Sequence, residues 1–118
     1  MNLARRHLAY AVLATAAITV PSAALASAEH ARARSAGTHT VVLSGLRFHP
    51  STVVIKRGES VKWVWRDGGI AHNVTGHGFH SNTQSSGSLT VRFTHSGTFR
   101  YECTIHVGVG MVGKVVVH

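Results

Sequence analysis

The chain has 118 residues, twelve of them Lys or Arg and four Asp or Glu, which gives a formal net charge of +8. This length allows one small domain. The basic residues are scattered and do not alternate with aromatic ones, which argues against a protein that binds single-stranded nucleic acid. Cys103 is the single cysteine, so a disulfide within the chain is excluded.

The first 28 residues have the order of a secretory signal peptide. Two arginines at 5–6 open it, an apolar run covers 8–20, and small residues follow. We expect cleavage after Ala28, with Ala26 as the alternative. The apolar run is shorter than the roughly 20 residues that span a bilayer. We therefore expect an exported protein, periplasmic or extracellular, without stable membrane insertion; the paired arginines leave the twin-arginine route open beside the general one.

Residues 29–118 form the predicted exported protein. Its ten Lys and Arg residues and four acids give a net charge of about +6, which favours an acidic partner or an acidic surface. Residues 29–37 (EHARARSAG) show no apolar period and predict a flexible arm. The folded domain is expected over residues 38–118.

The rest of the chain predicts short β-strands separated by Gly, Pro, Asn and Ser, without a helical period of useful length. Strands are expected at residues 38–43, 52–56, 60–66, 72–75, 88–94, 98–103 and 112–117. The polar residues 76–87, rich in Gly and Ser, are expected to form a loop or a frayed edge. About seven or eight such strands predict an all-β sandwich or small barrel.

Alternation of side chains is clearest in two of these strands. In residues 61–65 both tryptophans and Val61 share one face. In residues 98–103 Cys103 shares a face with Phe99 and Tyr101. Cys103 is therefore expected to point into the apolar interior at the end of a strand.

Residues 103–111 read CTIHVGVGM and bring a thiol, an imidazole and a thioether into one loop between two strands. Cu(I) favours sulfur ligands, Cu(II) accepts imidazole, and a site with two His, one Cys and a distant Met suits both states. The loop supplies His106 and Met111, so a second histidine must come from elsewhere. His72 is the best candidate, because a turn at residues 68–69 precedes it and lets it approach the loop.

Each of these residues also has an ordinary structural explanation. Cys103 can be an inert buried thiol, Met111 can fill the core and His72 can be a hydrogen-bonded histidine at a strand end. A zinc site with one Cys and two His is chemically possible, although zinc does not ordinarily take a thioether. The pair His77-x2-His80 can form a second, weak metal site or remain solvated.

Six stretches share a pattern with a known family. They are FHP at 48–50, VVIKRGE at 53–59, VKWVW at 61–65, GGIAHNV at 68–74, GTFRYEC at 97–103 and the C-x2-H-x4-M ending. The resemblance as a whole runs from about residue 40 to residue 118, and the spacing from the cysteine to the methionine is its most specific part. On these stretches the chain resembles the cupredoxins, the type 1 blue copper proteins of the plastocyanin, pseudoazurin and halocyanin kind.

The resemblance implies a Greek-key β-sandwich that holds a single copper ion. It implies that His72, Cys103 and His106 are the equatorial ligands and that Met111 is the weak axial ligand. Many relatives have proline just before the second histidine, where this chain has Ile105. The difference implies a less rigid ligand loop.

The resemblance also implies a supporting shell and an exposed edge. Asn73 would tie the two ligand loops together through its side-chain amide, with Thr104 as its backbone partner. His106 would be the partly exposed ligand through which electrons pass. An apolar rim for docking would surround it, made of Ile70, Val107 and Val109.

These features predict a mobile one-electron carrier that cycles between Cu(I) and Cu(II). The alternative is an exported copper-handling protein, a buffer or chaperone, that uses the same ligands. Catalysis is not expected, because one cysteine cannot build a binuclear copper centre and the four acids show no catalytic arrangement. The expected partners are redox proteins with an acidic docking face, and the chain is expected to be a monomer that does not bind nucleic acid.

Overall fold

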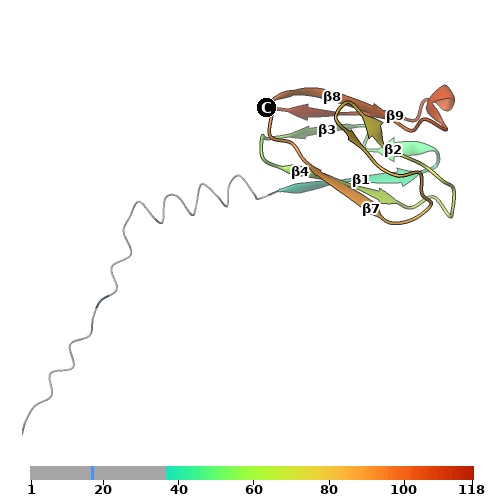
Figure 1. Cartoon of the computed structure of the whole chain (residues 1–118), viewed down its shortest axis with the longest axis horizontal. Coiled ribbons are helices and arrows are strands. Elements are labelled where there is room, and N and C mark those ends of the chain that lie inside the picture. Colours follow the sequence, from blue (N-terminus) through green and yellow to red (C-terminus); the bar gives the residue numbers. More distant parts are fainter. Residues whose placement is uncertain (1–16, 18–36) are drawn as a thin grey trace, which may run out of the picture.

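The computed structural model describes Ala17 and residues 37–118 (Figure 1). Apart from Ala17 and Gly37, the predicted signal peptide (residues 1–28) and the predicted arm (residues 29–37) lie outside the described residues. No helix within the described part of the chain is long and apolar enough to cross a membrane.

The described domain consists of nine β-strands and one short 3-10 helix. The strands are β1 (Thr38–Ser44), β2 (Arg47–His49), β3 (Thr52–Ile55), β4 (Ser60–Trp65), β5 (Thr75–Gly76), β6 (Phe79–His80), β7 (Ser88–Arg92), β8 (Gly97–Glu102) and β9 (Val112–Val117). The 3-10 helix η1 (Val107–Val109) lies in the loop between β8 and β9.

The strands form two sheets that pack face to face (Figure 1). One sheet has the order β2-β1-β4-β7 and the other has the order β3-β9-β8-β5-β6. The pairs β1–β4 and β3–β9 are parallel, and the other pairs are antiparallel. Because the chain crosses between the sheets after β2, β3, β4, β6 and β7, the strands interleave. The predicted all-β Greek-key sandwich is confirmed.

The core lies between the two sheets and depends on strict alternation in β4. Val61, Trp63 and Trp65 are 0%, 0% and 5% exposed, as the sequence predicts. The Trp63 ring packs against Tyr101 from β8 with the ring centroids 5.2 Å apart. A Cβ atom at Gly113 of β9 would lie 2.5 Å from the Tyr101 ring, so this glycine makes room for the tyrosine.

Two short elements differ from the expectation. The strand expected at residues 72–75 is wrong, because His72 forms only an isolated bridge with Gln84 and β5 begins at Thr75. The strand β2 was not expected. Residues 76–87, expected as a loop or a frayed edge, contain the two-residue edge strand β6. Strands of two or three residues are too short to show alternation, and their pairing depends on neighbours that are distant in sequence.

Pairing of β5 with the end of β8 positions the predicted site. Thr75 lies opposite Glu102, so the residues just before β5 lie beside Cys103, which follows β8. Figure 1 shows the loop that contains η1 at one end of the sandwich and the C-terminus at the opposite end. We call these ends the metal end and the basic end. Lys56, Arg57 and Arg92 lie at the basic end, together with His118.

Candidate metal centre

Three predicted ligands, His72, Cys103 and His106, meet at the metal end. The Nδ1 atoms of His72 and His106 are 3.0 Å apart. The Sγ atom of Cys103 lies 3.9 Å from Nδ1 of His72 and 3.6 Å from Nδ1 of His106. His72 and Cys103 are fully buried, whereas His106 is half-buried. The three donor atoms form a triangle that solvent reaches only past His106.

Two neighbours fix the orientation of His72. Its Nε2 atom donates a hydrogen bond to Oδ2 of Asp67 at 2.7 Å, and the indole N–H of Trp65 donates to its backbone carbonyl at 3.0 Å. Because Nε2 carries the proton in the neutral imidazole, Nδ1 presents its lone pair to the other two donors. Metal-binding histidines are commonly oriented by a carboxylate in this way.

Asp67 is itself held in place from the opposite side. Its carboxylate accepts hydrogen bonds from the backbone N–H groups of Gly45 at 2.9 Å and Leu46 at 3.1 Å. The Leu46 N–H and then the His72 ring lower the pKa of Asp67 below its ordinary value of 3.8. The carboxylate is therefore charged at neutral pH and fixed beside the imidazole of His72.

Backbone hydrogen bonds close the loop of residues 103–111. The N–H of Cys103 donates to the carbonyl of Met111 at 3.1 Å, and the N–H of Met111 donates to the carbonyl of His106 at 3.3 Å. Gly110 turns the chain with a left-handed φ of 86°, and Arg47 donates to the Val109 carbonyl at 2.7 Å. The loop thus returns Met111 to the side of Cys103.

Met111 is fully buried at the base of this loop. Its thioether lies in the same core as Cys103. The N–H of Cys103 donates a hydrogen bond to the Met111 carbonyl, so the two residues are neighbours. The structure therefore brings all four predicted metal-binding residues to one end of the sandwich.

Asn73 connects the two segments that carry the ligands. Its Oδ1 atom accepts from the backbone N–H of Thr104 at 3.0 Å, and its Nδ2 group donates to the hydroxyl of Thr104 at 2.8 Å. Nδ2 also approaches the hydroxyl of Thr83 at 3.1 Å, and the Thr75 hydroxyl donates to Oδ1 at 2.9 Å. The expected role of Asn73 and Thr104 is confirmed.

The donor triangle fits a metal ion of copper size. Metal–nitrogen distances of about 2.0 Å and a metal–sulfur distance of about 2.3 Å in a trigonal plane require N–N and N–S separations of about 3.5 and 3.7 Å. The structure has 3.0 Å between the nitrogens and 3.6 and 3.9 Å to the sulfur. One thiolate, two imidazoles and a buried thioether form a soft donor set, which favours copper over zinc.

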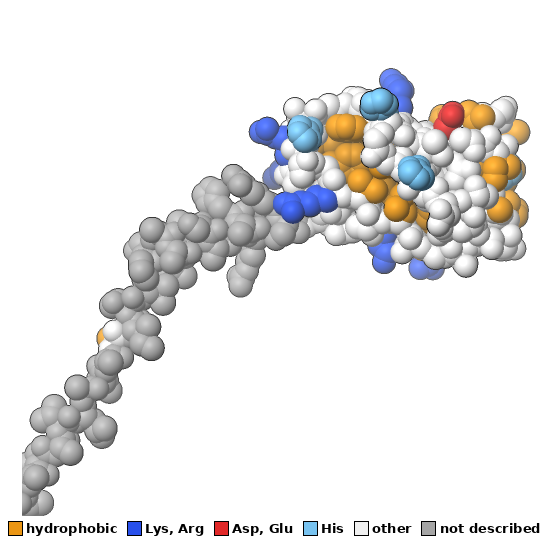
Figure 2. Space-filling view, viewed as in Figure 1, with side chains coloured by type: hydrophobic (Ala, Val, Ile, Leu, Met, Phe, Trp, Pro, Cys, Tyr) orange, Lys and Arg blue, Asp and Glu red, His pale blue; other side chains and the backbone are white. Residues whose placement is uncertain are grey.

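Exposed apolar side chains lie on both sides of His106 in the sequence. Figure 2 shows hydrophobic side chains at the end of the domain opposite the start of β1, as well as a band across the middle of the visible face. The predicted rim residues Ile70, Val107 and Val109 are 44%, 40% and 55% exposed, and Ile105 is 51% exposed. We call these four residues the apolar rim. An exposed apolar group around a buried site is typical of a docking surface.

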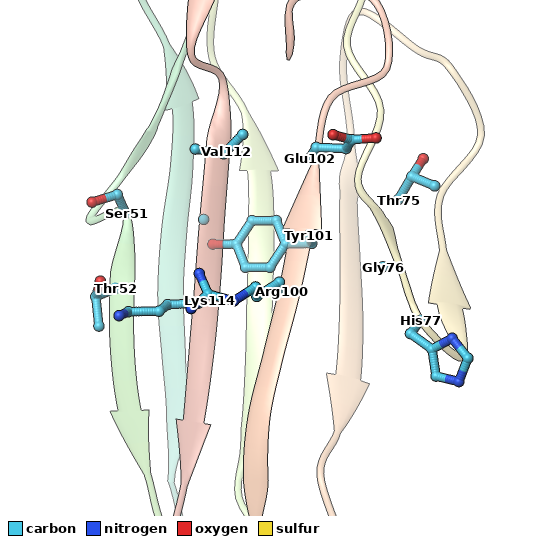
Figure 3. A pocket seen from close by; sticks show the side chains of 11 residues that line it. Ser51, Thr52, Thr75, Gly76, His77, Arg100, Tyr101, Glu102, Val112 and Lys114 are labelled. Atoms are coloured by element: carbon cyan, nitrogen blue, oxygen red, sulfur yellow. The ribbon is translucent and has the colours of Figure 1, made fainter.

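A hollow of about 560 Å³ lies over β8 and β9 (Figure 3). Arg100 and Lys114 line it together with Glu102 and His77, so its charges are mixed. Within residues 37–118 and Ala17, the one group of three or more His, Cys or acidic residues that could hold a metal is His72, Cys103 and His106. His77 and His80 form no such group there.

Three supporting residues were not identified from the sequence. They are Asp67, which binds His72, Trp65, which binds the His72 backbone, and Arg47, which binds the Val109 carbonyl. A carboxylate five residues before a candidate ligand, with Gly68-Gly69 between them, was the available signal for Asp67. The contact of Arg47 spans 62 residues and leaves no local signal.

The bonds of Asn73 yield a prediction about stability. Asn73→Ala removes the amide that joins the two ligand segments and leaves the Thr104 N–H without its partner. We expect the free energy of unfolding of the metal-free protein to fall by about 1–3 kcal/mol, measured by urea denaturation. Asn82→Ala is the control, because Asn82 is exposed, and it should change stability by less than about 0.5 kcal/mol. Equal effects of the two changes would contradict the bridging role.

Comparisons with known proteins agree with this geometry. Residues 35–118 match the family described as copper binding proteins, plastocyanin/azurin family. The chain is 36% identical to a chloroplastic plastocyanin from Tetradesmus obliquus over 61% of this chain, and it spans only 59% of that relative. It is 33% identical to the chloroplastic plastocyanin of Chlamydomonas reinhardtii, over 90% of this chain and 81% of the relative.

Two further matches concern copper more directly. The chain is 33% identical to the copper-resistant cuproprotein CopI of Rubrivivax gelatinosus, over 72% of this chain and 68% of the relative. A solved structure of the Cu(I) form of an amicyanin mutant superposes with a TM-score of 0.63 at 27% identity, over 70% of this chain and 84% of the other. Family match, fold and donor set agree, and the chain belongs to the plastocyanin/azurin family of copper-binding proteins.

Proposed function

We propose that the protein is a blue copper electron carrier that moves one electron at a time. Its single copper ion is held by His72, Cys103, His106 and Met111. The observation that carries this proposal is the triangle of one sulfur and two nitrogens at 3.0, 3.6 and 3.9 Å, with a fully buried methionine beside it. Bound copper would supply the Cu(II)/Cu(I) couple.

The protein contributes a site that stays the same in both oxidation states. His72 is held by the hydrogen bond that its ring donates to Asp67 and by the one that its carbonyl accepts from Trp65, and Asn73 holds the segment that follows Cys103. Because these groups are fixed by the fold, the ligands cannot rearrange much when the charge on the metal changes. Small rearrangement favours fast electron transfer, and burial of Cys103 excludes water from the sulfur.

Electrons enter and leave through His106 in this proposal. It is the one member of the donor triangle that is not fully buried, and the apolar rim surrounds it. The partner is a redox protein with an apolar contact area and acidic residues at its margin. Arg47, which lies against the Val109 carbonyl, would face those acids. Association through such charges is sensitive to ionic strength.

A copper-handling role is the second candidate, and the relative named copper-resistant cuproprotein favours it. A buffer or chaperone must release copper to an acceptor, whereas a carrier keeps it through many redox cycles. Two of the three donors of the triangle are fully buried, which favours retention. Copper transfer to a competing chelator in both oxidation states distinguishes the two roles.

The remaining parts of the proposal concern the setting of the protein. We propose that it is exported to the periplasm or the extracellular space, since its first 28 residues have the order of a signal peptide. We propose that it is not an enzyme, because a mononuclear site with four protein ligands leaves no open position for a substrate. We also propose that it is a monomer.

Copper addition tests the ligand set. The purified protein should develop an intense blue band when Cu(II) is added, because a thiolate ligand transfers charge to Cu(II). Cys103→Ser removes the single thiol of the chain and should abolish the band. His80→Ala is the control, since His80 is exposed and outside the triangle, and it should leave the spectrum unchanged. A blue band in the Cys103→Ser variant would contradict the proposed ligand set.

Asp67 yields a prediction about the reduction potential. Asp67→Asn keeps the shape of the side chain but removes a negative charge next to His72. A nearby negative charge stabilises Cu(II) over Cu(I), so the potential should rise by tens of millivolts, measured by redox titration. Glu59→Gln is a matched control, because Glu59 also binds a histidine, His39, but at the basic end. If both variants shift the potential equally, the effect of Asp67 is not local.

Charge on the apolar rim should slow electron exchange. Val109→Asp places a charge beside His106 that two copies would have to bury when their rims meet. We expect the electron self-exchange rate, measured by NMR line broadening, to fall by about tenfold or more. Val54→Asp is matched, since Val54 and Val109 are both 55% exposed and Val54 lies in β3. Similar rates for both variants would exclude the apolar rim as the contact surface.

A further inference from the structure

A second hollow lies at the end of the sandwich opposite the metal centre. Its volume is about 580 Å³, and its lining consists of Lys56, Arg57, Gly58, Arg92, Thr94 and His118. Three of these residues are cationic and none is acidic. All except Gly58 are exposed. This hollow gives the basic end its name.

Backbone hydrogen bonds bring the three cations together from different strands. The N–H of Arg57, after β3, donates to the carbonyl of His118, after β9, at 3.1 Å. The N–H of Gly58 donates to the carbonyl of Phe93, after β7, at 2.7 Å, and Nε of Arg92 donates to the Gly58 carbonyl at 3.0 Å. The fold therefore fixes the backbone positions of the cluster and the side chain of Arg92.

Negative charge offsets these cations only in part. Of the three acids in the described residues, Asp67 and Glu102 lie toward the metal end. Glu59 lies at the basic end, where it binds His39 and offsets one of the three cations. Figure 2 shows Lys and Arg side chains at the end where β1 begins.

The segment that precedes the domain carries Arg32 and Arg34 together with Glu29. These residues lie outside the described part of the chain. The basic end is therefore defined by Lys56, Arg57 and Arg92 alone.

The arrangement suits an extended anionic surface better than a single small anion. The backbone N–H groups of residues 57–60 at the hollow are all bonded to carbonyls, so none remains to bind one phosphate. The cations instead spread over several turns at one end of the domain. Many weak attractions of this kind bind a polybasic surface to anionic lipid headgroups.

We propose that the basic end binds the surface of an anionic phospholipid membrane. This goes beyond the proposed electron transfer and concerns where the protein acts. The six residues of β9 separate the two ends, a span of about 20 Å. A protein held by its basic end would therefore keep the apolar rim and His106 facing away from the membrane, free to meet a partner.

Vesicle binding tests the proposal. The protein from residue 29 onward contains the whole core and both arginines of the preceding segment. It should sediment with vesicles of phosphatidylcholine and phosphatidylglycerol at low ionic strength, and it should remain in solution with pure phosphatidylcholine. The variant Lys56→Gln/Arg57→Gln/Arg92→Gln should lose about a hundredfold in partition coefficient, since each cation near an anionic surface contributes about fivefold.

A matched control separates the site from net charge. Lys62→Gln/Arg100→Gln/Lys114→Gln removes the same charge from elsewhere; Arg100 and Lys114 line the hollow of mixed charge in Figure 3. This control should lose less than about fivefold. The double variant Lys56→Gln/Arg57→Gln keeps the bond from Arg92 to Gly58, and it should lose about twentyfold with unchanged thermal stability.

Three results would overturn the proposal. One is equal loss in the variant and the control, which would show that net charge alone acts. Another is release of the protein from vesicles by millimolar inorganic phosphate at constant ionic strength, which would indicate a site for a single phosphate. The third is absence of binding to anionic vesicles. None of these results bears on the blue copper spectrum, so failure here and failure of the proposed function are distinguishable.

Discussion

The bridge between Asn73 and Thr104 is the constraint on which the metal end depends. The two residues are 31 positions apart, and each directly follows a predicted ligand in the sequence, Asn73 after His72 and Thr104 after Cys103. A sandwich brings the ends of its strands together only to within several ångströms, because loops can shift. The paired hydrogen bonds at 3.0 and 2.8 Å remove this freedom. Without them, the pairing of β5 with β8 would bring His72 near Cys103 but would not fix the distance.

Around this bridge the fold assigns each ligand a different degree of restraint. His72 is held by Asp67 through its ring and by Trp65 through its backbone. Cys103 and Met111 are joined by their backbones. His106 is half-buried; hydrogen bonds hold its backbone, but among the described residues its ring has polar contacts only with His72 and Cys103. Restraint thus decreases from the core toward the surface, in the direction of the apolar rim.

Much of this arrangement could be predicted from the sequence, for physical reasons that differ by residue. Alternation in β4 predicted the burial of Trp63 and Trp65, because a pleated strand alternates its faces. Close spacing predicted the Cys103 loop, because a short loop keeps its residues together. Arg47 was missed, since its contact with Val109 joins residues 62 positions apart. Asp67 was missed although it lies only five residues before His72, because a sequence does not show which way a carboxylate in a glycine turn points. The strand expected at residues 72–75 was wrong, because the side chain of Asn73 bonds to the neighbouring loop in place of continuing a regular ladder.

The burial pattern also determines how the metal reaches its ligands. Cys103, Met111 and His72 are all 0% exposed, and His106 is the one donor with surface of its own. In the proposed copper site, an incoming ion would therefore meet this imidazole before it reaches the thiol. The same burial shields the thiol of the metal-free protein from oxidants. One surface histidine would thus serve both metal uptake and the proposed electron transfer.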